Sequence, residues 1–221
     1  MDNQALLERL HKDALAIAAV ALAGGPTLVR QVPTCPDWTV SDLLGHLGQV
    51  QDWVCRMLRT REYAEERPVV AEPQRAVEEF ISGVSGYLIA MRSITPDEPC
   101  WAFGPEPHLC QFWIRRQAHE HAVHRVDLES VFGTTPDIEP EFAADGVDEL
   151  LTLFRGPATH PSVLLSAADT GDTWRLGDGD PTAVITADAK TLYLGLWKRI
   201  DLLEQSRVDG DRHAAEQAVA G

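Results

Sequence analysis

The sequence has no long hydrophobic run: no apolar stretch of its 221 residues approaches the roughly 20 residues that a helix needs to cross a bilayer. Its beginning mixes charged and apolar residues at helical spacing, unlike a secretory signal peptide. Basic residues are few, 19 Lys and Arg against 34 Asp and Glu, which gives a formal net charge of −15. Such a surface repels phosphate backbones and anionic lipid, so we expect a cytoplasmic protein without nucleic-acid or membrane partners.

Cysteine is scarce as well. The four cysteines, Cys35, Cys55, Cys100 and Cys110, form no CxxC pair and show no spacing typical of a disulfide framework. We therefore expect reduced, mostly buried thiols. Internal repeats and low-complexity tracts are also absent, and the 44% of hydrophobic residues is ordinary for a globular protein with a real core.

The sequence does contain four helical patterns before Pro136. Apolar residues recur at spacings of three and four over residues 3–24, about 40–60, 73–91 and about 109–132. Glycines end the first and fourth of these patterns. Four long helices joined by short connections predict a helical bundle over residues 1–135.

The connection before the second helix has its own signals. Residues 32–38 carry two prolines and are expected to form an ordered loop. Thr39 then offers an N-cap, with Asp42 three residues later, the spacing of a capping box.

After Pro136 the pattern changes. Residues 141–155 have a helical pattern, and three short β-type runs follow at 163–169, 173–176 and 182–188, separated by turns rich in Gly and Asp. Asp188 can cap a helix that reaches Ile200, and the remainder holds a DGD turn and a short terminal helix. We expect a small α+β domain over residues 136–221, and the fold class as a whole is α+β.

One histidine of the second helix lies on an apolar face. His46 shares its row with Leu43, Val50, Trp53 and Met57, so its side chain is predicted to point into the bundle. By itself this pattern favours a neutral core histidine held by one hydrogen bond over a metal ligand.

The fourth helix carries a polar row that changes this balance. The row reads Trp113, Gln117, Glu120, His124, Asp127 and Val131. An unpaired carboxylate buried on such a face costs several kcal/mol or shifts its pKa, and a bound dication offsets that cost. Because Glu120 and His124 are one turn apart, both can reach the same ion, and with His46 they predict a divalent metal site.

Other residues of this helix compete for the role. His119-Glu120 begins like the metalloprotease motif HExxH, but the motif fails because residue 123 is valine. His121 lies roughly 100° from the Glu120 row and is expected to face solvent or the second domain. Asp127 is either a fourth ligand or, as we prefer, an outer acceptor or substrate-side carboxylate.

Two histidines and one carboxylate leave coordination positions open, which is typical of a catalytic rather than a structural metal. No cysteine is paired with these residues to close the shell. Zinc is the first expectation, and iron(II) or nickel would also suit the donor set.

Three segments carry a resemblance to a known family: CPDWTVSDLLGHLG (35–48), WAFGP (101–105) and FWIRRQAHEHAVHRVDLES (112–130). Together they resemble the mycothiol-dependent maleylpyruvate isomerase family, and the resemblance covers nearly the whole chain. It implies a DinB-like four-helix bundle followed by a small C-terminal domain.

The resemblance also implies roles for individual residues. The family's ligands match His46, Glu120 and His124, the same three that helical phase predicts. An open zinc position would receive the thiolate of mycothiol, a low-molecular-weight thiol. Arg199 lies in the stretch that matches an arginine implicated in the isomerase activity, although a surface cation at a helix C-terminus is the simpler interpretation.

We therefore expect a mycothiol-dependent S-transferase or isomerase acting on a small electrophilic molecule, in a chain that is a monomer or a weak homo-oligomer. Arg199 or Arg116 would bind a substrate carboxylate by bidentate contact. One alternative is a metal-dependent hydrolase that uses zinc-bound water, with Asp127 as the candidate general base. Another is a non-catalytic, metal-stabilised binding module.

Overall fold

The computed structural model describes residues 1–69, 72–154 and 161–220. It divides into two compact units, residues 2–136 and residues 137–221 together with Met1. Among the helices of the described residues, none combines the length and the hydropathy of a membrane span.

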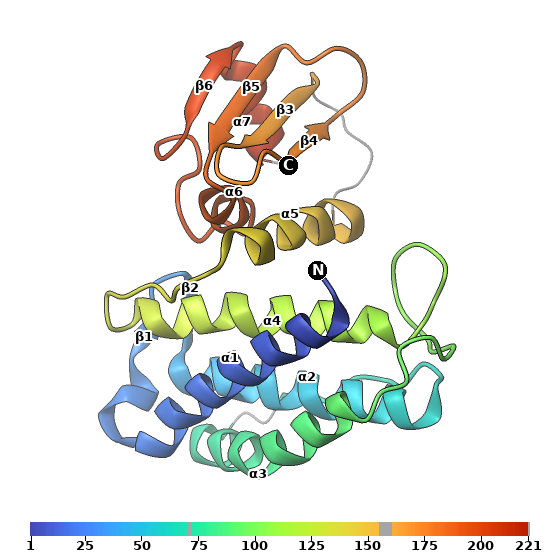
Figure 1. The fold of residues 1–221 in the computed structure, drawn as a ribbon. Helices are drawn as coiled ribbons and strands as arrows, with labels where there is room; N and C mark the ends of the chain where they lie inside the picture. Colours follow the sequence, from blue (N-terminus) through green and yellow to red (C-terminus); the bar gives the residue numbers. More distant parts are fainter. Residues whose placement is uncertain (70–71, 155–160, 221) are drawn as a thin grey trace. The chain divides into compact units, whose positions relative to one another are not determined.

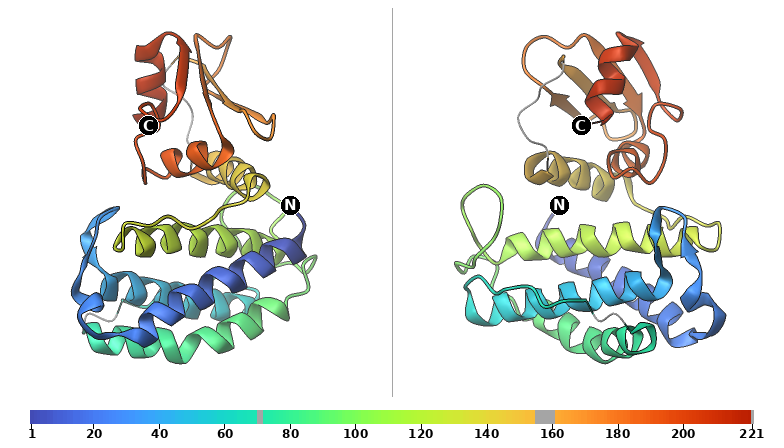
Figure 2. Two further views of the ribbon diagram at one scale, coloured as in Figure 1. Left: turned by 60° about the vertical axis from the view of Figure 1, so that its left-hand side comes forward. Right: turned by 180° about the vertical axis from the view of Figure 1, so that it is seen from behind.

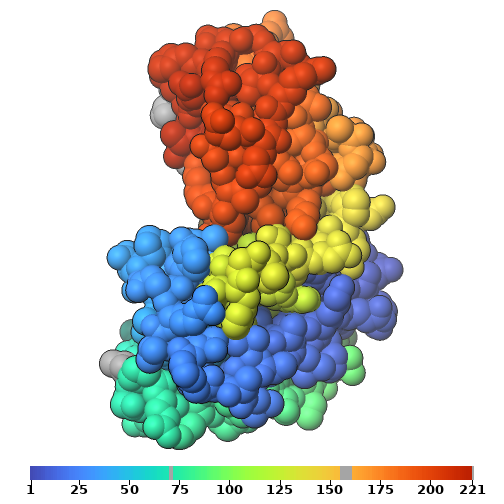
Figure 3. All heavy atoms as spheres, turned by 90° about the vertical axis from the view of Figure 1, so that its left-hand side faces the viewer, coloured from blue at the N-terminus to red at the C-terminus, as the bar shows by residue number. Residues whose placement is uncertain are grey.

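The first unit consists mainly of four long helices, α1 (Asn3–Ala23), α2 (Val40–Thr60), α3 (Pro73–Arg92) and α4 (Gln111–Ser130), which confirms the predicted helical N-terminal region (Figures 1 and 2). Helix α1 packs against α3 and α4, and α2 packs against the same two helices. Their shared core includes the fully buried Leu10, Leu43, Phe80 and Trp113. The space-filling view shows one face of this unit, on which residues close to 30 (blue) lie beside the end of α4 (yellow-green), and Arg30 donates a hydrogen bond to the carbonyl of Val131 (Figure 3).

A capping box begins α2, as the sequence predicts. The Thr39 hydroxyl oxygen accepts the Asp42 N–H at 3.3 Å, and Asp42 Oδ2 accepts the Thr39 N–H at 2.8 Å. These bonds satisfy donors that a helix N-terminus leaves without intrahelical partners. The start of α2, six residues before His46, is therefore fixed.

The segment before α2, which we expected to be an ordered loop, contains regular secondary structure. After the short 3₁₀ helix η1 (Gly25–Val29), strands β1 (Gln31–Val32) and β2 (Cys35–Thr39) pair antiparallel as a hairpin. Its two prolines do not prevent this, because Pro33 lies in the turn and a two-stranded ribbon leaves an outer edge on which Pro36 needs no N–H partner.

In its described residues, the second unit is a four-stranded mixed sheet with three helices, which confirms the predicted α+β fold. The strand order is β4-β3-β5-β6, with β3 (Val163–Ala167) and β5 (Ala183–Ala187) parallel and β4 (Thr173–Leu176) antiparallel to β3. Helix α7 (Arg212–Ala220) packs on β3 and β5, and α5 (Pro140–Phe154) packs on α6 (Ala189–Leu196) (Figure 1).

One strand of this sheet was missed. We expected a turn at DGD, but β6 (Arg207–Gly210) extends the sheet antiparallel to β5. The strand is short and lies at the edge of the sheet, where charged side chains are favoured, so its sequence RVDG lacks the apolar alternation that would predict a strand.

Candidate metal centre

Helices α2 and α4 bring the three predicted ligands together. His46, Glu120 and His124 each offer one donor atom, and these atoms all lie within 4.8 Å of one another. Glu120 Oε1 is 3.1 Å from His46 Nε2 and 3.3 Å from His124 Nε2. The side chains are 17% (Glu120), 26% (His46) and 10% (His124) exposed, so the group is largely buried yet reachable from solvent.

Glu120 is held in its ionised form. Burial raises the pKa of this carboxyl, but hydrogen bonds with His124 and His46 and the charges of His124 and Arg116 outweigh burial and hold the pKa well below its usual range. Arg116 Nη2 donates to Glu120 Oε2 at 2.6 Å. One carboxylate oxygen thus meets an arginine while the other faces both histidines.

His124 has its second ring nitrogen engaged by a carboxylate. Its Nδ1 donates to Asp127 Oδ2 at 2.9 Å, and Asp127 is fully buried. Burial lowers the pKa of His124, but the hydrogen bonds to Asp127 and Glu120 and the charges of these carboxylates outweigh burial and raise the pKa to about 9. A carboxylate on the far nitrogen of a ligating histidine fixes the ring and leaves Nε2 for a metal, so the geometry gives Asp127 the place of an outer partner.

These residues fit a divalent metal. The donors are two imidazoles and one ionised carboxylate, the set found with catalytic zinc, and they converge from two packed helices. The largely buried negative charge of Glu120 gains a direct partner when a dication is present.

Sequence analysis missed two further contacts, both from the β1–β2 hairpin. The Trp38 ring lies 5.0 Å from the His46 ring and 6.0 Å from the His124 ring, between centroids. The Thr34 hydroxyl donates to Asp127 Oδ1 at 2.7 Å. The sequence held one indication of these contacts, because Trp38 directly precedes Thr39, the N-cap of α2. Nothing in the sequence pattern indicated that the hairpin folds toward α4.

Known proteins share this architecture. Residues 9–129 match the family model described as the mycothiol maleylpyruvate isomerase N-terminal domain, and residues 141–217 match the MDMPI C-terminal domain. The chain belongs to the mycothiol maleylpyruvate isomerase family.

Two crystal structures of the mycothiol-dependent maleylpyruvate isomerase, one of them of a histidine-to-alanine mutant, each superpose on this chain with a TM-score of 0.62. Each is 15% identical in sequence, and each alignment covers 96% of this chain and 95% of the other. Likeness at this identity shows the fold. Among curated proteins, none matches the chain.

The expectation that His121 faces solvent or the second domain was wrong. This side chain is fully buried within the helical unit, where its ring stacks on that of Tyr87 with centroids 5.3 Å apart. Its Nδ1 donates to the Gln117 carbonyl at 3.0 Å and its Nε2 accepts from Gln51 Nε2 at 3.1 Å. Burial lowers the pKa of His121 to about 4, so this member of the family keeps a neutral histidine in its core.

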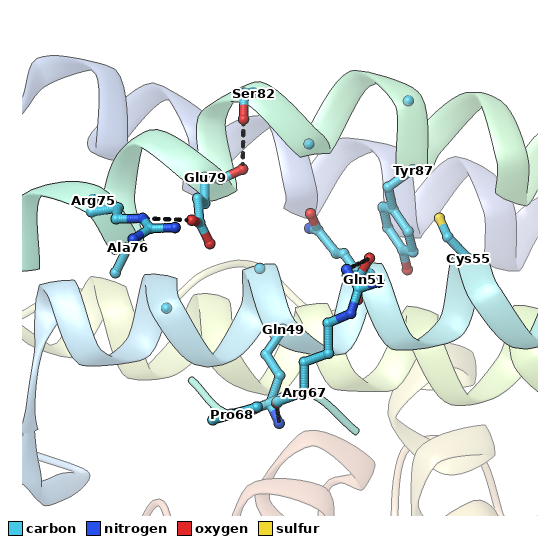
Figure 4. Close-up of a pocket in the computed structure, with 15 residues that line it drawn as sticks. Gln49, Gln51, Cys55, Arg67, Pro68, Arg75, Ala76, Glu79, Ser82 and Tyr87 are labelled. Atoms are coloured by element: carbon cyan, nitrogen blue, oxygen red, sulfur yellow. Dashed lines mark hydrogen bonds and ion pairs between the residues drawn. The ribbon is translucent and has the colours of Figure 1, made fainter. Parts of the chain in front are cut away.

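A separate groove of about 790 Å³ runs between α2 and α3 (Figure 4). Gln51 and Tyr87 reach its wall, and Gly83 and Gly86 of α3 line it. Among the described lining residues, none is a predicted metal ligand. This groove is therefore distinct from the candidate metal centre.

Arg199 belongs to the second unit. The helix that we expected to reach Ile200 ends at Leu196, and Lys198 adopts a left-handed φ of 61°. Arg199, half-buried, donates from Nη1 to the Trp197 carbonyl at 2.7 Å, and its guanidinium lies 5.9 Å from the Trp197 ring centroid. Its role in substrate binding stays a prediction.

Proposed function

We propose that this protein is a metal-dependent enzyme, with zinc the first candidate, that uses mycothiol to modify a small electrophilic substrate. The observation that carries the proposal is the convergence of His46, Glu120 and His124 with Asp127 behind them. Family membership supports the thiol, because the structurally similar crystal structures are of a mycothiol-dependent isomerase.

Two reactions share the same thiol chemistry. As an isomerase, the thiol would add to a conjugated double bond, allow rotation about the resulting single bond, and leave again. As an S-transferase, the sulfur would stay attached to the substrate.

A zinc ion held by the three ligands would supply the activation, because coordination deprotonates a thiol whose free pKa is about 8.5. The protein's own residues prepare this site. Glu120 contributes a negative charge, and Arg116 stabilises this charge by donating a hydrogen bond to Oε2, the oxygen that does not face the histidines. Asp127 accepts a hydrogen bond from His124 Nδ1 and so directs Nε2 toward the other donors.

The hydrolase alternative finds little support. It needs a general base beside the open position, and Asp127 was its only candidate. Asp127 is fully buried, and its two oxygens accept from His124 and Thr34. A buried carboxylate that is engaged in this way is better suited to orient His124 than to take a proton from a water nucleophile.

For the substrate carboxylate, Arg199 is the stronger of our two candidates. Arg116 is only 3% exposed and its guanidinium is paired with Glu120, so binding a substrate would break that pair. Arg199 is half-buried, and a role in substrate binding would leave the Arg116–Glu120 pair intact.

A calorimetric titration of the zinc-loaded protein with mycothiol, with and without a chelator, tests the proposal. We expect binding that the chelator abolishes, and turnover of candidate electrophiles only when mycothiol is present. Thiol-independent turnover would favour a hydrolase, and no binding of mycothiol by the zinc-loaded protein would contradict the proposal.

A further inference from the structure

The β1–β2 hairpin touches the metal centre at two points, although it supplies none of the three ligands. Thr34, in the turn between the strands, bonds to Asp127. Trp38, in β2, lies against the rings of His46 and His124. One hairpin therefore reaches ligands from both helices.

This hairpin is anchored to the helices that bear the ligands. Val32 is fully buried, and the guanidinium of Arg30, directly before β1, donates to the carbonyl of Val131, the residue after α4. At the other end, Thr39 closes the capping box of α2. Side chains that project from so fixed a backbone can hold their neighbours in place.

Thr34 fixes the carboxylate that orients His124. A carboxylate bound through one oxygen can still turn about its terminal torsion, which is broad and soft. Asp127 is bound at both oxygens, by His124 Nδ1 at 2.9 Å and by the Thr34 hydroxyl at 2.7 Å. With Asp127 held in this way, the His124 ring is held with Nε2 3.3 Å from Glu120 Oε1.

Trp38 restrains both imidazoles by contact with its ring. The His46 and His124 rings meet edge to face with centroids 4.9 Å apart, and the indole is inclined to them by 43° and 29° respectively. His46 is the most exposed of the three ligands, so it has the most freedom to turn toward water. The indole occupies part of the space into which these rings would rotate.

We propose that the β1–β2 hairpin is the positioning element of the metal centre: Thr34 acting through Asp127, and Trp38 acting on the ligand rings, hold His46 and His124 in their ligating orientations. Thr34 and Trp38 are positioning residues and make no bond to the metal. The inference rests on the proposed metal site, and its test separates the two.

The test is the affinity for Zn²⁺ alone, measured by competition with a chromophoric chelator. Thr34→Val keeps the shape of the side chain but removes the donor, and Thr34→Ser keeps the donor. Thr60→Val, at the exposed end of α2, is the matched control. We expect Thr34→Val to raise the Kd for Zn²⁺ about tenfold, the lower end for outer-sphere partners, with Thr34→Ser and Thr60→Val close to wild type.

A second pair, Trp38→Phe and Trp38→Leu, keeps the inference testable if Thr34→Val does not fold. The phenyl ring should retain more Zn²⁺ affinity than the leucine side chain. The absorption spectrum of the Co²⁺-loaded protein should change in Thr34→Val and Trp38→Leu, because it reports ligand geometry rather than global stability.

The outcomes are distinct. If the wild type binds no Zn²⁺, the proposed metal site itself is wrong. If the wild type binds Zn²⁺ and the Thr34 and Trp38 variants bind it equally well, only the role of the hairpin is overturned. Equal losses of Zn²⁺ affinity in Thr34→Val and Thr34→Ser would also overturn the role of the Thr34 hydroxyl.

Discussion

At the scale of single residues, the proton on His124 competes with the metal. The pKa of about 9 places a proton on His124 Nε2 at neutral pH in the metal-free protein, while Glu120 is already ionised. A metal must therefore displace this proton.

We accordingly expect the affinity for Zn²⁺ to rise about tenfold per pH unit from pH 6.5 to about 9, with about one proton released per ion bound near pH 7. Calorimetry in buffers with different ionisation enthalpies measures both quantities. An affinity that does not change over this range would show that His124 is not a ligand.

Arg199 supports a different residue-scale prediction. If it binds a substrate carboxylate, Arg199→Ala should lower turnover without lowering metal content, because Arg199 belongs to the second unit and the three candidate metal ligands belong to the helical unit. Arg207→Ala, which removes a 75%-exposed side chain of β6, is the control and should be neutral. Unchanged kinetics in Arg199→Ala would leave it a structural residue.

At the scale of elements, helix α4 buries polar and charged side chains that would ordinarily face water. The stability of the metal-free protein depends on the positive charge of His124, because folding raises the pKa of this residue from 6.5 to about 9. This contribution is present in full below pH 6.5 and is lost as the pH rises through 9.

The free energy of unfolding of the metal-free protein should therefore fall by about 2 kcal/mol between pH 6.5 and 8.5. Urea unfolding at several pH values measures the slope, and His124→Gln should flatten it. Below pH 6.5, neutral His121 acts in the opposite sense, because its lowered pKa makes stability decline as the pH falls toward 4. A free energy of unfolding that rises between pH 6.5 and 8.5 would contradict this account.

Strand β6 gives a second element-scale prediction. Gly210 has a φ of 95°, and a Cβ at this position would lie 2.4 Å from the Thr182 carbonyl oxygen. Gly171 has a similar φ of 80°, but a Cβ there would have no described atom within 4 Å. Gly171→Ala should lower the free energy of unfolding by on the order of 1–2 kcal/mol through backbone strain alone, and Gly210→Ala should lower it distinctly more. Amide hydrogen exchange in β5 and β6 checks the order, and equal costs would contradict it.

How far sequence predicts these elements depends on how local the signals are. The helix that bears His46 was predicted from periodicity and its capping box, both of which lie within a few residues. The hairpin and β6 were missed because short strands are defined by their partners, which local patterns do not specify. His121 was misplaced for a similar reason: its partners Gln51 and Tyr87 come from other helices.

At the scale of the whole molecule, the family fold persists at 15% identity to its solved relatives. The helical unit brings the three candidate metal ligands together through two helices and one hairpin, whereas Arg199 belongs to the second unit. The convergence of His46, Glu120 and His124 was predictable because helical phase is a strict geometric rule, whereas the positions of Thr34 and Trp38 depend on how a connecting segment packs.

The most direct test of the central claim is the metal content of purified protein, measured by elemental analysis in the wild type, His46→Ala, His124→Ala and the control His213→Ala. His213 is an exposed histidine of α7. We predict about one divalent metal per chain in the wild type and in His213→Ala, and almost none in the other two, with all four folded by circular dichroism. Equal metal in His46→Ala, His124→Ala and the wild type would contradict the account.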